Sequence, residues 1–355
     1  MRKVAVVTTG FFDGVHLGHR HVLETVVSAA RERGEEAIVV TFWPHPRTVL
    51  QQDAREFRLL TSLEEKKALL AHAGIDRVEV LPFTREFATL KAEEYLQLLR
   101  TRFAATLIVM GYDNHIGSDR KTAKELCDVD VLKVDALENY FSQGFAKNQF
   151  SNAITRPGTE ENYFLQSFAK NQFSSAHSDP SSCHSEPSSC HSEHSYCHSE
   201  RSEESPGTIS STKIRLALEE GRIQEANEML GYSYGLYGVV VAGNRMGRTI
   251  GFPTANMHLY EPLKLVPGNG VYAVEVEVLG AKYKGMCNIG TRPTVGGTTR
   301  TIETHILDFE QDIYGLPMRL RFLRRIRDER KFPSLEALRA QLLEDRQQIR
   351  TQTVL

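Results

Sequence analysis

The sequence predicts two domains in series: an α/β domain built on a parallel sheet, then a small antiparallel β-barrel with a C-terminal helix. The first half alternates short apolar runs with stretches of helical periodicity, which is typical of parallel strands covered by helices on both faces. The second half changes to a period of two, with Gly and Pro between the apolar runs, as in a closed antiparallel sheet. A length of 355 residues fits two domains of ordinary size.

Four buried strands and three helices are predicted in the first half. The second helix begins at a capping box, in which Thr61 is followed three residues later by Glu64. The predicted helices cover residues 19–33, 62–73 and 91–103. The predicted strands are Val4–Thr9, Ala37–Phe42, Val78–Leu81 and Thr106–Met110.

Residues 138–206 differ in composition from both halves. Glu138–Phe150 recurs as Glu161–Phe173, and a seven-residue repeat with Cys-His pairs follows it. The serine-rich part after Phe173 lacks Leu, Ile, Val, Phe and Met, so it cannot bury enough apolar surface to offset its ordering entropy. We therefore expect an acquired, disordered insertion. Zinc or partner binding by the Cys-His pairs is the alternative, although a spacing of seven is not that of a zinc finger.

Order is predicted to resume at Ile209. Two short helices come first, at Lys213–Glu220 and Ile223–Leu230. A final helix at about 334–350 begins with Ser334 as its N-cap and carries a stripe of Leu335, Leu338, Leu342 and Ile349. The strands predicted between them are Tyr237–Ala242, Tyr272–Leu279, Lys282–Asn288, Ile302–Phe309 and Met318–Arg324.

Charge and composition exclude several classes of protein. Acidic residues outnumber basic ones by 45 to 43, which argues against a nucleic-acid partner or an anionic membrane surface. The sequence contains no run of about 18 apolar residues, the length that a helix needs to span a bilayer. The first residues do not resemble a signal peptide. The odd number of cysteines, 5, favours reduced thiols. We therefore expect a cytoplasmic protein, with nothing in the sequence to name a protein partner.

The most specific pattern, Gly10-Phe-Phe-Asp-Gly-Val-His-Leu-Gly-His-Arg20, directly follows the first predicted strand. Its glycines allow tight turns and a close approach of backbone to ligand. His16 and His19 stand at the start of the next helix, where free N–H groups and the helix dipole favour anions. Two imidazoles there can donate hydrogen bonds to phosphate oxygens and stabilise charge as a P–O bond breaks. A surface histidine pair and a metal site are the alternatives, but no third ligand is spaced nearby.

This pattern resembles the His-x-Gly-His signature of the nucleotidyltransferase superfamily. A second motif of that superfamily should follow downstream, and Ile209-Ser-Ser-Thr-Lys-Ile-Arg215 fits it. The resemblance implies an α/β Rossmann-like nucleotidyltransferase domain that the insertion interrupts before this second motif. It makes His16 and His19 catalytic. The residues that it assigns to ATP and its phosphates are Gly10, Phe12, Asp13, Gly18, Ser210, Ser211, Thr212 and Arg215.

Two further stretches fit the same resemblance. Thr41-Phe-Trp-Pro-His-Pro46 should line the flavin or nucleotide cleft. Gly111–Gly117 occupies the place of a family loop in which Asp113 matches a flavin-binding position. In this loop Asn114 and Ile116 replace aromatic residues of the usual pattern.

A second polar cluster lies in the C-terminal half. In Gly243–Asn256, glycines 243, 247 and 251 suggest a flexible flap over phosphates, and Arg248 can neutralise one of them. Thr254 and Asn256 offer oxygen ligands to a hard cation, which suits Mg²⁺ shared with substrate phosphates. Glu303 follows on a later strand. A carboxylate on an inward face near a hydroxyl substrate can act as a general base, and an exposed strand-face charge is the alternative.

The order and spacing of these motifs resemble riboflavin kinase. Gly251–Asn256, Gly270-Val-Tyr-Ala, Asn288-Ile-Gly, Arg292-Pro-Thr and Glu303-Thr-His carry this likeness. Together with the first half, the chain resembles the bifunctional riboflavin kinase/FMN adenylyltransferase (FAD synthetase) family. The resemblance implies that Thr254 and Asn256 organise Mg-ATP, that Arg292 contacts the flavin and that Glu303 is the catalytic base of a β-barrel kinase domain.

The family resemblance implies two transfers that consume ATP. The kinase domain, 231–355, would phosphorylate riboflavin to FMN. The adenylyltransferase domain, 1–137 with 207–230, would convert FMN to FAD and release pyrophosphate, and 138–206 would be the insertion. The alternative is a riboflavin kinase alone, with the other half impaired by the insertion.

Overall fold

The computed structural model describes residues 3–50, 57–112, 114–126, 130–135, 208–243, 246–294 and 297–351. At 246, 292–294 and 297–299 it describes the backbone only. Asp113 and the predicted insertion, 138–206, therefore lie outside the described residues. Both domains discussed below belong to one compact unit, which comprises Met1–Leu137 and Ile209–Leu355.

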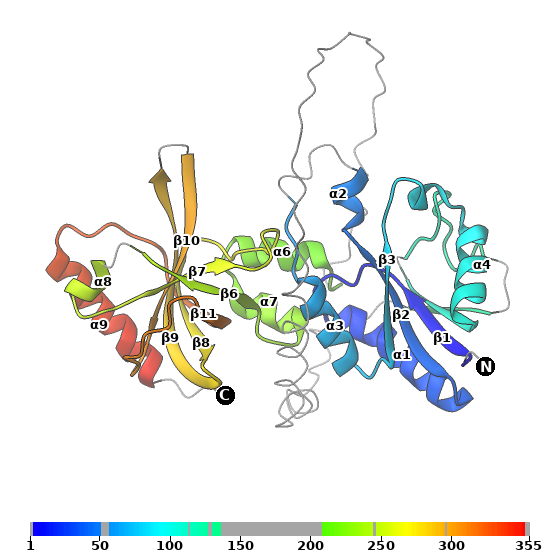
Figure 1. The fold of residues 1–355 in the computed structure, drawn as a ribbon, viewed down its shortest axis with the longest axis horizontal. Coiled ribbons are helices and arrows are strands. Elements are labelled where there is room, and N and C mark those ends of the chain that lie inside the picture. Colours follow the sequence, from blue (N-terminus) through cyan, green and yellow to red (C-terminus); the bar gives the residue numbers. More distant parts are fainter. Residues whose placement is uncertain are drawn as a thin grey trace, which may run out of the picture. The chain divides into compact units, whose positions relative to one another are not determined.

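The first half folds as a parallel sheet with helices on both faces, as the fold-class prediction states (Figure 1). Every neighbouring pair of strands is parallel. Helix α4 (Ala92–Phe103) packs on the face that presents Val7, and helices α1 (Leu17–Arg33) and α3 (Leu63–His72) pack on the face that presents Val6. The strand order is β3 (Arg77–Pro82), β2 (Glu36–Trp43), β1 (Ala5–Thr9), β4 (Ala105–Gly111) and β5 (Val131–Val134).

The capping box predicted at Thr61 is wrong by one residue. Ser62 is the N-cap of α3, where its hydroxyl accepts from Glu65 N and the Glu65 carboxylate accepts from Ser62 N. Thr61 is instead fully occupied elsewhere, because its hydroxyl accepts from Gly14 N and donates to Asp13. Three short elements of this half were not predicted: α2 (Pro46–Leu50), the 3₁₀ turn Phe87–Thr89 and the edge strand β5.

The second half is a closed antiparallel barrel, preceded by helices α6 (Ser211–Glu219) and α7 (Ile223–Leu230). Its short strand β7 was not predicted. The predicted strand ending at Phe309 stops at Ile306, because Asp308 has a φ of 56° in the left-handed region. Around the barrel the order is β10 (Gly297–Ile306), β7 (Ala255–Leu259), β6 (Gly235–Val241), β11 (Pro317–Arg327), β8 (Gly270–Val278) and β9 (Ala281–Thr294).

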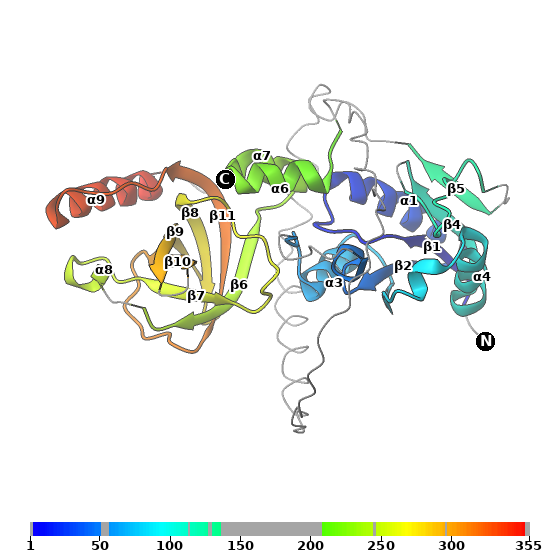
Figure 2. The ribbon, with the colours of Figure 1, turned by 90° about the horizontal axis from the view of Figure 1, so that it is seen from above.

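Helix α9 (Leu335–Thr351) lies against the outside of the barrel (Figure 2). Ser334 caps it as predicted, with its hydroxyl accepting from Ala337 N. Ile349 packs with Met286 and Leu307 in an apolar layer between helix and strands. Leu335 is 51% exposed, so the buried stripe starts later than predicted. In the part of the chain that the structure describes, no helix is both long and apolar enough to cross a membrane.

Candidate functional site

The loop between β1 and α1 has an unusual backbone. Phe12 and Val15 adopt positive φ angles of 52° and 37°, and Gly14 has a φ of 81°. A side chain at Gly18 would press on the His16 ring, because its Cβ would lie 3.3 Å from Cε1 and Nδ1 of that ring. These turns bring the loop to the start of α1, where His16 is the N-cap.

His16 and His19 form a stacked pair whose ring centroids are 3.7 Å apart. His16 Nδ1 accepts a hydrogen bond from His19 N, so in a neutral ring the proton is on Nε2. Burial, followed by the neighbouring His19, lowers the pKa of His16 well below its usual value. Burial, followed by the charges of Lys66 and Arg215, lowers the pKa of His19 to about 3. Both imidazoles are therefore neutral near pH 7, and each can donate one N–H.

Asp13 holds three segments together. Its carboxylate accepts from Leu60 N at 3.1 and 3.0 Å, from Thr61 N at 3.0 Å and from Arg215 at 2.6 Å. The Asp13 side chain is 3% exposed. Its oxygens thus already accept hydrogen bonds from the protein. Asp13, which the resemblance assigns to ATP and its phosphates, therefore holds the loop in place.

The second motif lies against the first. Ser210 caps α6 by accepting from Lys213 N, and Ser211 donates its hydroxyl hydrogen to the Asp13 carbonyl at 3.1 Å. Arg215, on the same helix, also donates to Arg58 O at 3.0 Å. Helix α6 and the α1 loop therefore meet, although the predicted insertion separates them in sequence.

The stretch that ends β2 also lies beside this loop. The His45 ring is 3.9 Å from the Phe11 ring and 4.2 Å from the Phe57 ring, measured between centroids. Burial lowers the pKa of His45 to about 3. In the 111–117 loop, Asn114 donates to Thr9 O at 2.8 Å and so ties this loop to the end of β1. Motifs from three parallel strands therefore gather at one carboxyl edge of the sheet, where open α/β sheets bind ligands.

Lys66, which was not predicted as a site residue, also lies here. It is 0% exposed, and its Nζ is 3.3 Å from the centroid of the Phe11 ring. A lysine on an amphipathic helix is usually a solvated surface charge. Only the packing against Phe11 distinguishes Lys66 from its neighbour Lys67. No sequence signal would have separated the two.

The barrel carries the second candidate site on its outer face. Thr304 is 0% exposed and faces the interior, because its methyl group borders the same space beside Gly285 as the methyl groups of Val274 and Val276. Glu303 therefore points outward, which corrects the expected inward face. In the antiparallel ladders Glu303 is directly opposite both Asn256 and Asn288, so the three side chains share one face.

The flap before β7 places backbone against this cluster. A Cβ at Gly243 would lie 2.1 Å from Asn256 Nδ2, and one at Gly247 would lie 2.1 Å from Phe252 O and 3.6 Å from Thr254 Cγ2. Part of the flap is a single helical turn, α8 (Met246–Thr249), on which Arg248 is exposed. Gly251 has a φ of 81° and open space around it. Arg292 lies in β9, and its side chain is outside the described residues.

His305 lies on the same strand face as Glu303 and contacts the flap. It is 8% exposed, and its Nδ1 is 2.9 Å from Pro253 O. Its ring lies 5.0 Å from that of Phe252, between centroids. Among the described residues no three His, Cys, Asp or Glu side chains gather as a metal site. Thr254, Asn256 and Glu303 instead supply oxygen donors, which fit a hard cation held mainly by substrate phosphates.

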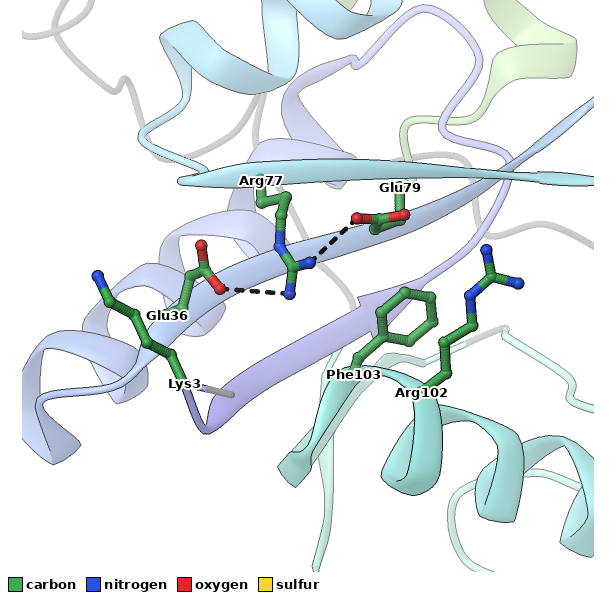
Figure 3. Close-up of a pocket in the computed structure, with 6 residues that line it drawn as sticks. All are labelled: Lys3, Glu36, Arg77, Glu79, Arg102 and Phe103. Atoms are coloured by element: carbon green, nitrogen blue, oxygen red, sulfur yellow. Dashed lines mark hydrogen bonds and ion pairs between the residues drawn. The ribbon is translucent and has the colours of Figure 1, made fainter. Parts of the chain in front are cut away.

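A separate pocket of about 470 Å³ lies at the other edge of the parallel sheet (Figure 3). Arg77 crosses it and pairs with Glu36 at 3.3 Å and Glu79 at 3.1 Å. Because Lys3, Glu36 and Arg77 precede or begin their strands, this pocket is at the amino edge, away from every motif above. Its lining consists of Lys3, Glu36, Arg77, Glu79, Arg102 and Phe103.

The fold and the two polar clusters define a two-domain chain with a nucleotidyltransferase-like α/β domain and a small kinase-like barrel. The family model described as FAD synthetase matches residues 1–140, and the model described as riboflavin kinase matches residues 230–353. The chain belongs to the bifunctional riboflavin kinase/FMN adenylyltransferase family.

Relatives of that description match almost the whole chain. The one from Listeria monocytogenes is 33% identical over 97% of this chain and 91% of its own length. The one from Escherichia coli is 33% identical over 96% and 90%. A solved structure from Streptococcus pneumoniae, described as a macrolide-efflux protein, matches with a TM-score of 0.77 at 30% identity, covering 99% of this chain and 96% of that one. The two-domain architecture is thus common to these chains.

Proposed function

We propose that this chain phosphorylates riboflavin to FMN and then adenylylates FMN to FAD, using one ATP in each step. The observation that carries the proposal is that each of the two domains has its own polar cluster. The α/β domain has the His16–His19 pair beside Arg215, and the barrel has Glu303 opposite Asn256. The substrates are then riboflavin, FMN and ATP, and we place the reaction in the cytoplasm.

In the kinase step, Glu303 accepts the proton of the terminal ribityl hydroxyl of riboflavin. The hydroxyl oxygen attacks the γ-phosphorus of ATP, its bond to phosphorus forms, and the bond to the departing ADP breaks. Thr254 and Asn256 would hold Mg²⁺, which neutralises charge on the phosphates when it is bound. The flap glycines and Arg248 cover the phosphates, and Arg292 orients the flavin.

In the adenylyl step, a phosphate oxygen of FMN attacks the α-phosphorus of ATP and pyrophosphate leaves. Because the His16 and His19 rings are neutral, they stabilise the leaving group by hydrogen-bond donation rather than by charge. The positive charge comes from Arg215, with hydroxyl donors from Ser210 and Thr212 and the backbone N–H of Ser211 at the start of α6. Gly10, Phe12 and Gly18 shape the loop, and Asp113 contacts the flavin.

The test separates the two reactions by their second products. Purified full-length chain is given riboflavin and Mg-ATP, and ADP is measured. In a parallel reaction it is given FMN and Mg-ATP, and pyrophosphate is measured. The proposal predicts ADP in the first reaction, equal to the sum of FMN and FAD formed, and pyrophosphate in the second, equal to the FAD formed. ADP without pyrophosphate would leave a riboflavin kinase alone and contradict the bifunctional proposal.

A further inference from the structure

Lys66 is a buried cation that the steps above do not use. It stands in the first turn of α3, is 0% exposed, and its Nζ has no hydrogen-bond partner in the described part of the chain. The ammonium sits 3.3 Å from the centroid of the Phe11 ring. Phe11 belongs to the loop directly after β1, so Lys66 reaches the loop that leads to His16 and to His19 in the first turn of α1.

A buried ammonium without hydrogen bonds is rare, because burial removes its hydration and nothing replaces it. The Phe11 ring offsets part of that loss through a cation–π contact. Other lysines nearby are paired. Lys264 is 5% exposed and donates to Leu60 O at 2.7 Å and to Glu65 at 2.6 Å. The surface residue Lys67 pairs with Glu64 at 3.0 Å.

The charges around Lys66 leave a positive balance. Lys66 and Arg215 are cations, whereas Asp13 is the carboxylate that acts on both. Asp13 already accepts from Arg215 and from the backbone of Leu60 and Thr61. The His19 and His45 rings, which also feel the charge of Lys66, have lowered pKa values and are neutral near pH 7. Beside the loop after β1, two basic side chains from α3 and α6 therefore face one carboxylate whose oxygens are already hydrogen-bonded.

We propose that Lys66 is a phosphate-binding residue of the adenylyltransferase site, whose ammonium, seated on the Phe11 ring, donates to a phosphate oxygen of a bound substrate beside His19. The phosphate belongs to ATP or to FMN, which present the same chemistry. This inference rests on the proposed FMN adenylyltransferase function and adds a residue to it.

The lowered pKa of Lys66 is consistent with this assignment. Burial lowers the pKa of Lys66 to about 7, so without ligand the ammonium is only partly charged near neutral pH. A bound phosphate favours the charged form and raises that pKa. The facing groups that enter this balance are Asp13, His19, His45 and Arg215. FMN adenylylation at limiting substrate should therefore fall as pH rises above about 7.

The test compares Lys66→Met and Lys66→Arg with Lys67→Met as the matched surface control. Loss of a charge-assisted hydrogen bond predicts that Lys66→Met lowers kcat/KM for FMN adenylylation by about 10- to 100-fold. Formation of FMN from riboflavin should equal that of the wild type, and the Tm should not fall, because a buried charge has been removed. The KM that rises, for ATP or for FMN, identifies the source of the phosphate. Lys66→Arg should recover part of the activity without the fall above pH 7.

Three outcomes would overturn the assignment. Wild-type FAD formation by Lys66→Met would show that the ammonium does not bind phosphate. A lower Tm with parallel loss of both activities, and no rescue by Lys66→Arg, would show a purely structural role. Wild-type protein that makes FMN from riboflavin but no FAD from FMN would remove the adenylyltransferase function itself, which is seen before any variant is made.

Discussion

Asp13 and Arg215 form an ion pair of 2.6 Å across a sequence separation of 202 residues. The pair joins the loop after β1 to helix α6, and both side chains are largely buried, at 3% and 16% exposed. Since Asp13 also holds Leu60 and Thr61, one carboxylate organises three segments of the proposed adenylyltransferase site. The phosphate motifs on either side of the predicted insertion therefore meet through this pair.

Replacing Arg215 by Met should abolish FAD formation and destabilise the α/β domain. The buried Asp13 carboxylate would lose its cation, which costs about 3 kcal/mol in the free energy of unfolding. Denaturant unfolding and a chromatographic FAD assay measure the two effects. Arg222→Met, at the N-cap position before α7, is the control, since Arg222 pairs on the surface with Glu220 and should change stability by less than about 0.5 kcal/mol.

Glu303→Gln should abolish riboflavin phosphorylation and leave FMN adenylylation unchanged. Without a carboxylate to accept the hydroxyl proton, FMN formation should fall by about 10²- to 10⁴-fold, while conversion of added FMN to FAD stays at the wild-type rate. Glu277→Gln in β8 is the matched control, because Glu277 pairs with Arg321 at 3.2 Å. An equal loss of both activities in Glu303→Gln would argue against a base at this position.

Gly243→Ala should impair the kinase by moving Asn256. The added methyl carbon would meet Asn256 Nδ2 at 2.1 Å, so one of the two must shift. A shift of this size should lower kcat/KM for Mg-ATP in FMN formation by at least about tenfold. Gly280→Ala, in the turn between β8 and β9, meets nothing within 4 Å; its φ of 72° makes the variant strain that turn and lower stability, but the kinase rate should be unchanged. Wild-type activity in Gly243→Ala would show that Asn256 does not position the nucleotide.

The buried neutral histidine pair predicts sensitivity to acid. The pKa of His19 is lowered from 6.5 to about 3 in the folded chain, so the unfolded chain binds more protons between these values. The stability that His19 contributes is present above pH 6.5 and is lost as pH falls toward 3. His19→Asn should therefore reduce the loss of unfolding free energy between pH 7 and pH 4.5, measured in urea, and should abolish FAD formation. An unchanged pH dependence in that variant would contradict the burial of a neutral ring.

Periodicity predicted the parallel sheet and the barrel of the two domains, because the apolar residues of a buried helix stripe or strand face recur at a regular spacing in the local sequence. It failed where distant contacts decide. Thr61 and Ser62 are equally good N-caps by composition, and Ser62 takes the place because Thr61 is held by Asp13 and Gly14. Strand β7 alternates apolar and polar residues, but it has only 5 residues and directly follows the glycine flap, so the sequence did not separate it from that loop.

For the site, motifs predicted the residues that gather after β1 and before α6, since the glycines and histidines have a recognisable spacing. The outward direction of Glu303 depends on the register between β10 and its neighbours, which a single strand does not reveal. Lys66 depends on the ring of Phe11, which lies far from it in sequence. Both features come from packing between segments that no local pattern connects.

The central claim is that one chain performs both transfers in order. The most direct measurement incubates purified full-length protein with riboflavin, ATP and Mg²⁺ and follows riboflavin, FMN and FAD by chromatography. The claim predicts that FMN rises first and that FAD then accumulates at its expense until riboflavin is consumed. FMN that accumulates to completion without FAD, or riboflavin that stays untouched in a folded sample, would contradict it.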